Sequence, residues 1–218
     1  MDAEGIVRKH YSRGDMEARV FGALRGAGVD VDHLRVDDLT GLDQLHAGGV
    51  PSTDHLLEAL ALTSATALLD VGSATAMPYD DASFSRAMIN HVGMNIEAKD
   101  RVFAEVRRVL EPDGLFAVYE QMRVGEGDLT YPLPWADDDS SSFVETRERY
   151  AALLQAAGFR IERDEDRTAE VAAVGPPPPG ALTPADLFGP GFAERIGNNI
   201  AATMVGILAP VLIVARAA

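Results

Sequence analysis

The chain has 218 residues, of which 47% are hydrophobic and 24% charged, and this length and composition fit one globular unit with a real core. It contains no cysteine, which excludes disulfides and thiolate metal sites and favours a reducing, cytoplasmic location. The formal net charge of −15 argues against nucleic acid as a partner, because binding phosphates needs clustered lysine and arginine.

Two segments bear on secretion and membranes. The amino-terminal stretch MDAEGIVRKHYSRGD has no apolar run after its charges, so it is not typical of a secretory signal. The most apolar segment, IAATMVGILAPVLIVA, is interrupted by Pro210 and is shorter than the roughly 18 residues that a spanning helix needs. We therefore expect no membrane partner and interpret this segment as a buried helix followed by a strand.

The amino-terminal part is expected to be mainly helical. Apolar residues recur at helical spacing over residues 3–27, whereas residues 31–52 are loop-rich with one short helix. Residues 52–62 begin with possible N-cap residues and continue as a helix. We assign residues 1–64 to a helical cap with a pre-sheet segment, and residues 65–218 to the main domain.

Strands alternate with helices in the remainder of the chain. Short apolar runs at 67–72, 84–91 and 115–122 are typical of strands buried on both faces, and the amphipathic segment 97–110 predicts a helix. The later elements are a helix over 143–158, a strand over 159–166, a helix over 188–205 and a final strand over 209–217. This alternation predicts an α/β protein with a largely parallel sheet.

The connection between the first two strands is unusually short. Two parallel strands of one sheet need a crossover of a dozen or more residues, usually with a helix. Between Gly72 and Phe84 the chain has only SATAMPYDDAS, in which Pro78 and two aspartates disfavour a helix and no apolar face recurs. Either a bare loop joins these strands, or part of the chain is absent.

The order of these segments resembles the class I S-adenosylmethionine-dependent methyltransferases, in particular the branch of small-molecule N-methyltransferases. LLDVGS is similar to the start of the family's glycine-rich first motif, ATAMPYDDASF to the segment before its fourth strand, and HVGMNIEAKDRVFAEVRRVLEPDGLFAVYE to strands four and five. The resemblance implies a Rossmann-like sheet, mostly parallel with an antiparallel last strand. It also implies S-adenosylmethionine as cofactor, S-adenosylhomocysteine as product, and a small-molecule methyl acceptor such as an amine.

The sequence departs from the family at one place. After Gly72 and Ser73 it passes directly to the segment that follows the family's third strand, so two βα units of about 30 residues each are missing. The resemblance therefore implies a sheet truncated on the side of its second and third strands, with strand one as a new edge. A free edge favours pairing with another chain, so we expect a homo-oligomer through that edge or a break near Ser73–Ala74. An in-frame deletion and a stretch missing from the chain as printed are both compatible with this junction.

The resemblance places the cofactor beyond the first strand. Asp70, Gly72 and Ser73 remain from the glycine-rich motif, and Ala74 and Thr75 lie where the family flanks the adenine. The acidic residue that binds the ribose in the family has no counterpart. The alternative for Asp70 is a polar residue that caps the end of a buried strand.

Polar residues near other strand ends are candidates for catalysis. His91 follows the second strand, and ligands bind beyond the carboxyl ends of such strands, so it is a candidate for both cofactor binding and catalysis. The resemblance adds Gln44 and His46, which lie in a loop that the family brings over the methionine end of the cofactor. The alternatives are a strand-end cap for His91 and an exposed loop for the other two.

The candidates for the substrate side are Asn95, Tyr119, Glu120, Tyr131 and Trp135. The two loop aromatics, Tyr131 and Trp135, would form a wall for an amine through cation–π contact, and the alternative is that they pack their loop onto the sheet. The histidines lack metal-ligand spacing, so no metal is expected. Two other functions compete with the enzyme: an inactive remnant that acts as a binding or self-association module and, with less support, a nicotinamide oxidoreductase.

Overall fold

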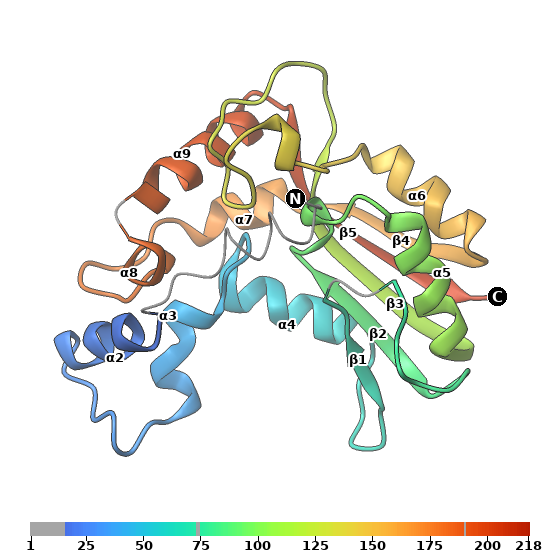
Figure 1. Cartoon of the computed structure of the whole chain (residues 1–218), viewed down its shortest axis with the longest axis horizontal. Coiled ribbons are helices and arrows are strands. Elements are labelled where there is room, and N and C mark those ends of the chain that lie inside the picture. The colour runs from blue at the N-terminus through green and yellow to red at the C-terminus, as the bar shows by residue number, and fades with distance from the viewer. Residues whose placement is uncertain (1–15, 73–74, 190) are drawn as a thin grey trace.

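A five-stranded sheet lies at the centre of the structure, a computed structural model that describes residues 16–72, 75–189 and 191–218 (Figure 1). Its strands are β1 (Leu68–Asp70), β2 (Phe84–Asn90), β3 (Leu110–Arg123), β4 (Phe159–Asp166) and β5 (Leu208–Ala217), in the spatial order β1–β2–β3–β5–β4. The strands β1, β2 and β3 run parallel, and β5 lies antiparallel between β3 and β4. The expected α/β class, the mostly parallel sheet and the antiparallel last strand are confirmed.

Each face of the sheet is covered by different helices. Helix α4 (Gly49–Ala59) packs on one face, and α5 (Lys99–Val109) and α6 (Arg147–Ala156) pack on the other. Side chains alternate along a strand, so Ala117 of β3 lies against α4 while its neighbour Val118 lies against α5 and α6. The apolar stripe of α5 is buried as its spacing predicts, through Val102, Phe103, Val106 and Val109.

The remaining helices form a lobe beside the sheet. Helices α2 (Met16–Gly26), α3 (Thr40–Asp43) and α8 (Pro184–Phe188) share a small core, and the 3₁₀ turn η1 (Val36–Leu39) precedes α3. The expected amino-terminal cap is therefore joined by a segment from late in the chain. The division at residue 64 stays a prediction.

The later elements differ from their predicted bounds in ways that local chemistry explains. The helix expected over 143–158 begins at Arg147, because the Thr146 side chain accepts a hydrogen bond from the Arg149 N–H at 3.1 Å. The strand β3 starts at Leu110, before the expected turn, and the register with β2 shifts at its start. Helices α7 (Thr168–Val174) and α9 (Gly191–Met204) and the 3₁₀ turns η2 (Gly93–Asn95) and η3 (Asp139–Ser141) complete the described elements.

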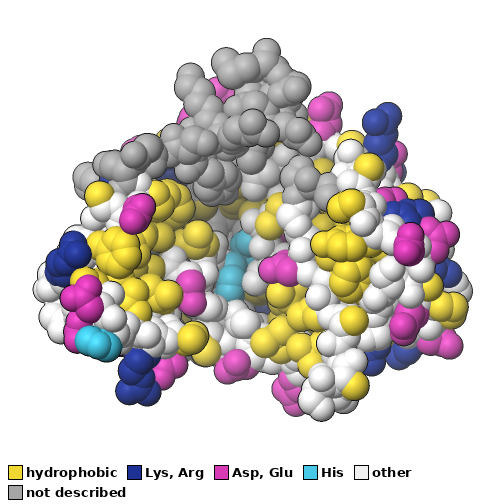
Figure 2. All heavy atoms as spheres, turned by 60° about the horizontal axis from the view of Figure 1, so that its bottom comes forward, with side chains coloured by type: hydrophobic (Ala, Val, Ile, Leu, Met, Phe, Trp, Pro, Cys, Tyr) yellow, Lys and Arg dark blue, Asp and Glu magenta, His cyan; other side chains and the backbone are white. Residues whose placement is uncertain are grey.

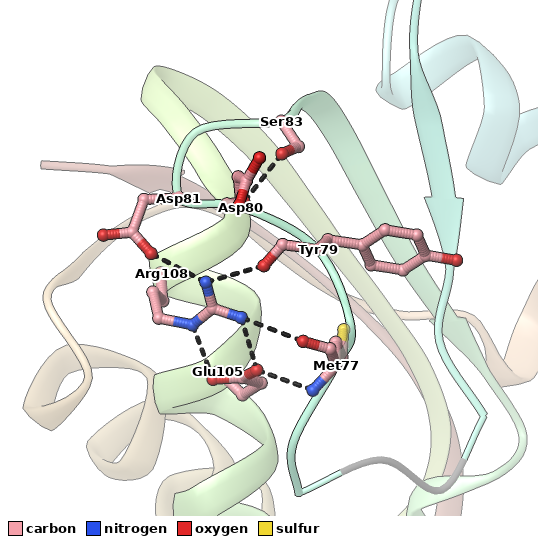
Figure 3. A network of polar contacts seen from close by, with 7 residues as sticks. All are labelled: Met77, Tyr79, Asp80, Asp81, Ser83, Glu105 and Arg108. Carbon is pink, nitrogen blue, oxygen red and sulfur yellow. Dashed lines mark hydrogen bonds and ion pairs between the residues drawn. The ribbon is translucent and has the colours of Figure 1, made fainter.

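The described part of the β1–β2 connection, residues 75–83, contains no helix and is tied to α5 by an arginine (Figure 3). The Arg108 guanidinium donates to the carbonyl oxygens of Met77 and Tyr79 at 3.2 and 2.9 Å and to the Asp81 carboxylate at 2.7 Å. Glu105 accepts the Met77 N–H at 2.7 Å, and its hydrogen bonds with Arg108 hold the pKa of its carboxyl down to about 2. These bonds fix a loop without secondary structure in place.

The free edge of the sheet lies beside this loop. Among the described residues, β1 pairs only with β2, as expected for a sheet that ends at its first strand. The predicted break at Ser73–Ala74 lies outside the described residues, and the loss of two βα units stays a prediction. No helix in the described ranges is long and apolar enough to cross a membrane.

Candidate active site

Three aromatic side chains meet above the carboxyl ends of the parallel strands. The ring centroid of His91 lies 5.8 Å from that of His46 and 5.0 Å from that of Tyr119, and the last two are 6.1 Å apart. Figure 2 shows a hollow between the sheet and the helical lobe with histidine side chains at its floor. In an open parallel sheet this edge is where ligands bind.

His91 is held in an unusual backbone conformation directly after β2. Its φ is 52°, in the left-handed region that few residues other than glycine and asparagine adopt, and its N–H donates to the Tyr119 carbonyl at 2.8 Å. The ring atom Nε2 is buried and has no hydrogen-bond partner among the described residues. Burial, with a smaller contribution from His46, lowers the pKa of His91 well below 6.5. At neutral pH the ring is therefore uncharged and able to accept a proton.

The loop that carries Gln44 and His46 is anchored to both α4 and β3. The Thr53 hydroxyl donates to Gln44 Oε1 at 2.7 Å and lies 2.9 Å from His46 Nε2. The Tyr119 hydroxyl donates to the Ala47 carbonyl at 3.0 Å. Burial also lowers the pKa of His46. The structure thus brings together Gln44, His46, His91 and Tyr119, which sequence reasoning selected separately.

The end of β1 supplies part of a cofactor site. Asp70 ends the strand, and burial raises the pKa of its carboxyl. A side chain added at Gly72 would meet no atom of the described residues within 4 Å, so these residues leave space beside this turn for a ligand. Thr75 is exposed, and Ser73 and Ala74 lie outside the described residues. The residues present fit one end of a nucleotide-like cofactor, but the described strands provide no acid beyond β1 for its ribose.

The remaining substrate candidates lie around the turn η2. The Asn95 side-chain oxygen is buried without a partner in the described part of the chain. Trp135 is buried and donates to the Ser142 hydroxyl at 3.0 Å, and Tyr131 packs in the same apolar cluster, which covers Met94. This pair therefore packs its loop against the molecule, and its contact with an amine stays a prediction.

Glu120 is not on the substrate side, which corrects the sequence-based expectation. Side chains alternate along β3, so Glu120 faces away from its neighbour Tyr119, towards α5 and α6. Its Oε1 accepts the N–H groups of Val92 and Gly93 at 3.2 and 2.7 Å, and the side chain is fully buried. Sequence reasoning missed its neighbour Lys99, which is also buried. Lys99 lies three residues before Val102, on the same face of α5 as the apolar stripe, and this spacing could have predicted its burial.

A parallel sheet with converging polar groups beyond its carboxyl ends defines a Rossmann-like ligand-binding protein. Residues 34–118 match the family model described as "Methyltransferase domain". Malonyl-[acyl-carrier protein] O-methyltransferase of Geobacter sulfurreducens is 28% identical over 178 residues, which are 75% of this chain and 64% of that protein. The chain thus spans less than two thirds of this curated relative's length.

Solved structures of low sequence identity share this fold. Geranyl diphosphate C-methyltransferase from Streptomyces coelicolor A3(2) has a TM-score of 0.64 at 14% identity, with 99% of this chain and 97% of that chain covered. The [4+2]-cyclase SpnF has a TM-score of 0.56 at 20% identity, with 93% and 94% covered. Residues 34–118 are thus similar to a methyltransferase domain, and the fold of the chain is that of Rossmann-like methyltransferases.

Proposed function

We propose that the chain transfers a methyl group from S-adenosylmethionine to a small molecule, with His91 as the general base. The observation that carries the proposal is the buried His91 ring, whose Nε2 has no hydrogen-bond partner in the described part of the chain and which lies beside His46 and Tyr119. A neutral imidazole at this place is able to take the proton that a nucleophile loses when it is methylated.

The protein's contribution to such a reaction is mostly geometric. When bound, the cofactor would supply a sulfonium-linked methyl group for transfer to a nucleophile. Asp70 and Gly72 would hold the cofactor at the end of β1, while Gln44 and His46 would close the loop of residues 44–48 over it. Orientation and the exclusion of water would supply most of the rate enhancement, and His91 would accept the proton transiently as it leaves the nucleophile.

An amine is the acceptor class that we favour. The support is the sequence resemblance to the small-molecule N-methyltransferase branch. Named relatives act on other atoms, since one is an O-methyltransferase and another a C-methyltransferase. The family alone therefore does not select the acceptor.

The location and assembly of the protein are also proposals. The absence of cysteine supports a cytoplasmic location. The outer edge of β1, which has no partner among the described strands, supports a homodimer formed through that edge. Light scattering after size exclusion would detect the dimer, and a monomer at all concentrations would exclude it.

An inactive binding module is the second candidate function, and one observation favours it. The described sheet ends at β1, so it provides no residue at the position where the family binds the ribose. The fold also does not fix the reaction, because the matched SpnF is a [4+2]-cyclase.

Calorimetric titration with S-adenosylhomocysteine separates the two candidates. Saturable binding with a dissociation constant near micromolar supports the enzyme. No detectable binding heat at millimolar S-adenosylhomocysteine supports the inactive binding module. Formation of S-adenosylhomocysteine in the presence of a panel of primary and secondary amines then tests catalysis.

The role of His91 is tested by His91→Asn, because asparagine tolerates the left-handed backbone at this position. We expect cofactor binding to remain and turnover to fall by about 10²- to 10⁴-fold. The matched control is His33→Asn on an exposed histidine, which should leave both unchanged. Equal turnover in wild type and His91→Asn would refute the base.

A further inference from the structure

The turn that follows His91 has little structure of its own. Its internal hydrogen bonds are those from the Asn95 N–H to the Val92 carbonyl at 2.9 Å and from the Ile96 N–H to the Gly93 carbonyl at 3.0 Å. A single 3₁₀ turn with so few bonds does not fix its own orientation. Because this turn directly follows His91, whatever holds the turn also affects where the His91 ring lies.

One buried carboxylate holds the start of this turn. Glu120 Oε1 accepts the N–H of Gly93 at 2.7 Å and that of Val92 at 3.2 Å, so consecutive backbone donors converge on the same oxygen. The approach is close because residue 93 is glycine: a β-carbon there would lie 2.9 Å from Glu120 Oε1 and 2.6 Å from the Tyr150 hydroxyl. The contact therefore depends on both the carboxylate and the missing side chain.

A buried ammonium group holds the end of the same turn. Lys99 Nζ donates to the Ile96 carbonyl at 2.6 Å and also to the Phe143 carbonyl. The Phe143 N–H in turn donates to the Met94 carbonyl at 2.9 Å, so the turn is attached to the segment before α6. The ammonium lies 5.7 Å from the centre of the Tyr150 ring, within range of a cation–π contact.

We propose that Glu120 is a positioning residue for the His91 base: its buried carboxyl oxygen Oε1 accepts the N–H groups of Val92 and Gly93 and thereby sets the place of the His91 ring in the hollow. Lys99 supports the same turn from its other end. This inference rests on the proposed function of His91. A buried ionisable pair is a weak source of stability and is often replaced by apolar residues without loss, so its benefit here lies in the geometry that it imposes.

The electrostatics of the cluster agree with this role. Burial raises the pKa of Glu120 to about 8 and lowers that of Lys99 to about 8, so both groups titrate in the same range. The groups that act on Glu120 are the backbone N–H groups of η2 and the Lys99 ammonium, which lower its pKa. The Tyr150 hydroxyl of α6 faces the same turn, and Glu145 acts on Lys99.

The test compares Glu120→Gln with Glu120→Ala. Glutamine keeps an oxygen that accepts the two N–H groups, whereas alanine leaves them unpaired in the interior. We expect the His91 ring resonances in histidine-labelled protein, and their titration, to stay near wild type in Glu120→Gln. In Glu120→Ala the apparent pKa of His91 should rise towards 6.5 as the turn opens to water, and kcat should fall by about 10- to 100-fold. Glu111→Gln, on an exposed glutamate of the same strand, is the control and should change neither.

The outcomes are distinguishable from a failure of the proposed function. The resonance of His91 reports its position without any turnover, so a shift confined to Glu120→Ala supports the inference even if no acceptor is methylated. An unchanged His91 titration in a folded Glu120→Ala protein overturns the inference while leaving the enzyme intact. If the alanine variant does not fold, Glu120→Asp moves the acceptor away from the turn while keeping the carboxyl group. A wild-type His91 titration in that variant would also refute the inference.

Discussion

Replacing Gly93 by alanine tests the packing of the buried cluster behind the candidate site. The added methyl group would lie 2.6 Å from the Tyr150 hydroxyl and 2.9 Å from Glu120 Oε1, whereas carbon and oxygen atoms in ordinary contact are about 3.4 Å apart or more. Something must therefore move by several tenths of an ångström. Overpacking of this kind costs about 1–3 kcal/mol, so we expect Gly93→Ala to lower the free energy of unfolding by about 2 kcal/mol.

Tyr150→Phe provides the second half of a double-mutant cycle. The hydroxyl is buried without a hydrogen-bond partner in the described ranges, so its removal should leave stability unchanged or raise it by about 1 kcal/mol. It also removes the shorter of the two contacts to the new methyl group. The double variant should therefore be more stable than additivity predicts, with a coupling of about 1 kcal/mol.

Urea unfolding followed by circular dichroism measures all four proteins. A typical slope of about 2 kcal/mol per molar urea converts the expected loss in Gly93→Ala into a midpoint lower by about 1 M. Gly22→Ala is the matched control, because no atom of the described residues lies within 4 Å of that β-carbon and alanine favours the helix by about 0.5–1 kcal/mol. A Gly93→Ala midpoint equal to wild type, or changes that add to within about 0.3 kcal/mol, would refute the reasoning.

Three further predictions address the β1–β2 loop, pH and the helical lobe. Arg108→Met should speed chymotrypsin cleavage after Tyr79, because the carbonyls of Met77 and Tyr79 lose their hydrogen-bond donor. The control Arg101→Met, on the exposed face of the same helix, should not change the cleavage rate. Equal cleavage rates in the two variants would contradict the attachment of the loop by Arg108. Burial raises the pKa of Glu120 from 4.5 to about 8, so between these pH values the folded state keeps a proton that the unfolded state releases. The contribution of this proton to the free energy of unfolding is fully present below pH 4.5. It is lost as the pH rises towards 8, by up to about 1.4 kcal/mol per pH unit. The unfolding free energy of wild type minus that of Glu120→Gln should fall over this range, and a flat difference would argue against a buried acid. Gly41→Ala would place a β-carbon 2.2 Å from the Leu182 carbonyl oxygen and should lower the melting temperature. Gly26→Ala, where no described atom lies within 4 Å of the added β-carbon, should not lower it. Equal melting temperatures would show that the helical lobe accommodates the Gly41→Ala methyl group without loss of stability.

The elements that sequence reasoning located are those with a strong local pattern. Helix α5 shows its apolar stripe at every third or fourth residue, and β5 is a continuous apolar run, so each could be assigned without a partner in view. The short β1–β2 connection was also evident from the sequence, because Pro78 and the following aspartates leave no room for a helix.

The missed features depend on contacts between distant parts of the chain. The place of Gly93 beside Tyr150 follows from how η2 meets α6, and no local pattern specifies it. The side-chain alternation of β3 could have predicted that Glu120 faces away from the substrate, but only once the register of that strand was known. The same holds for α8, whose packing against α2 and α3 links segments more than a hundred residues apart.

The shortness of β1 has a consequence for how any ligand of this protein should be detected. Among the described strands its three residues pair on one side only, whereas β3 is paired with β5 from Leu115 to Arg123. Local opening is therefore easiest on the flank that ends in Asp70 and Gly72, and hardest in the middle of the sheet. A small molecule bound at that flank would suppress local unfolding of β1 more than it would suppress global unfolding of the protein. Amide exchange resolved by residue is thus a more sensitive binding assay for this protein than a shift in melting temperature.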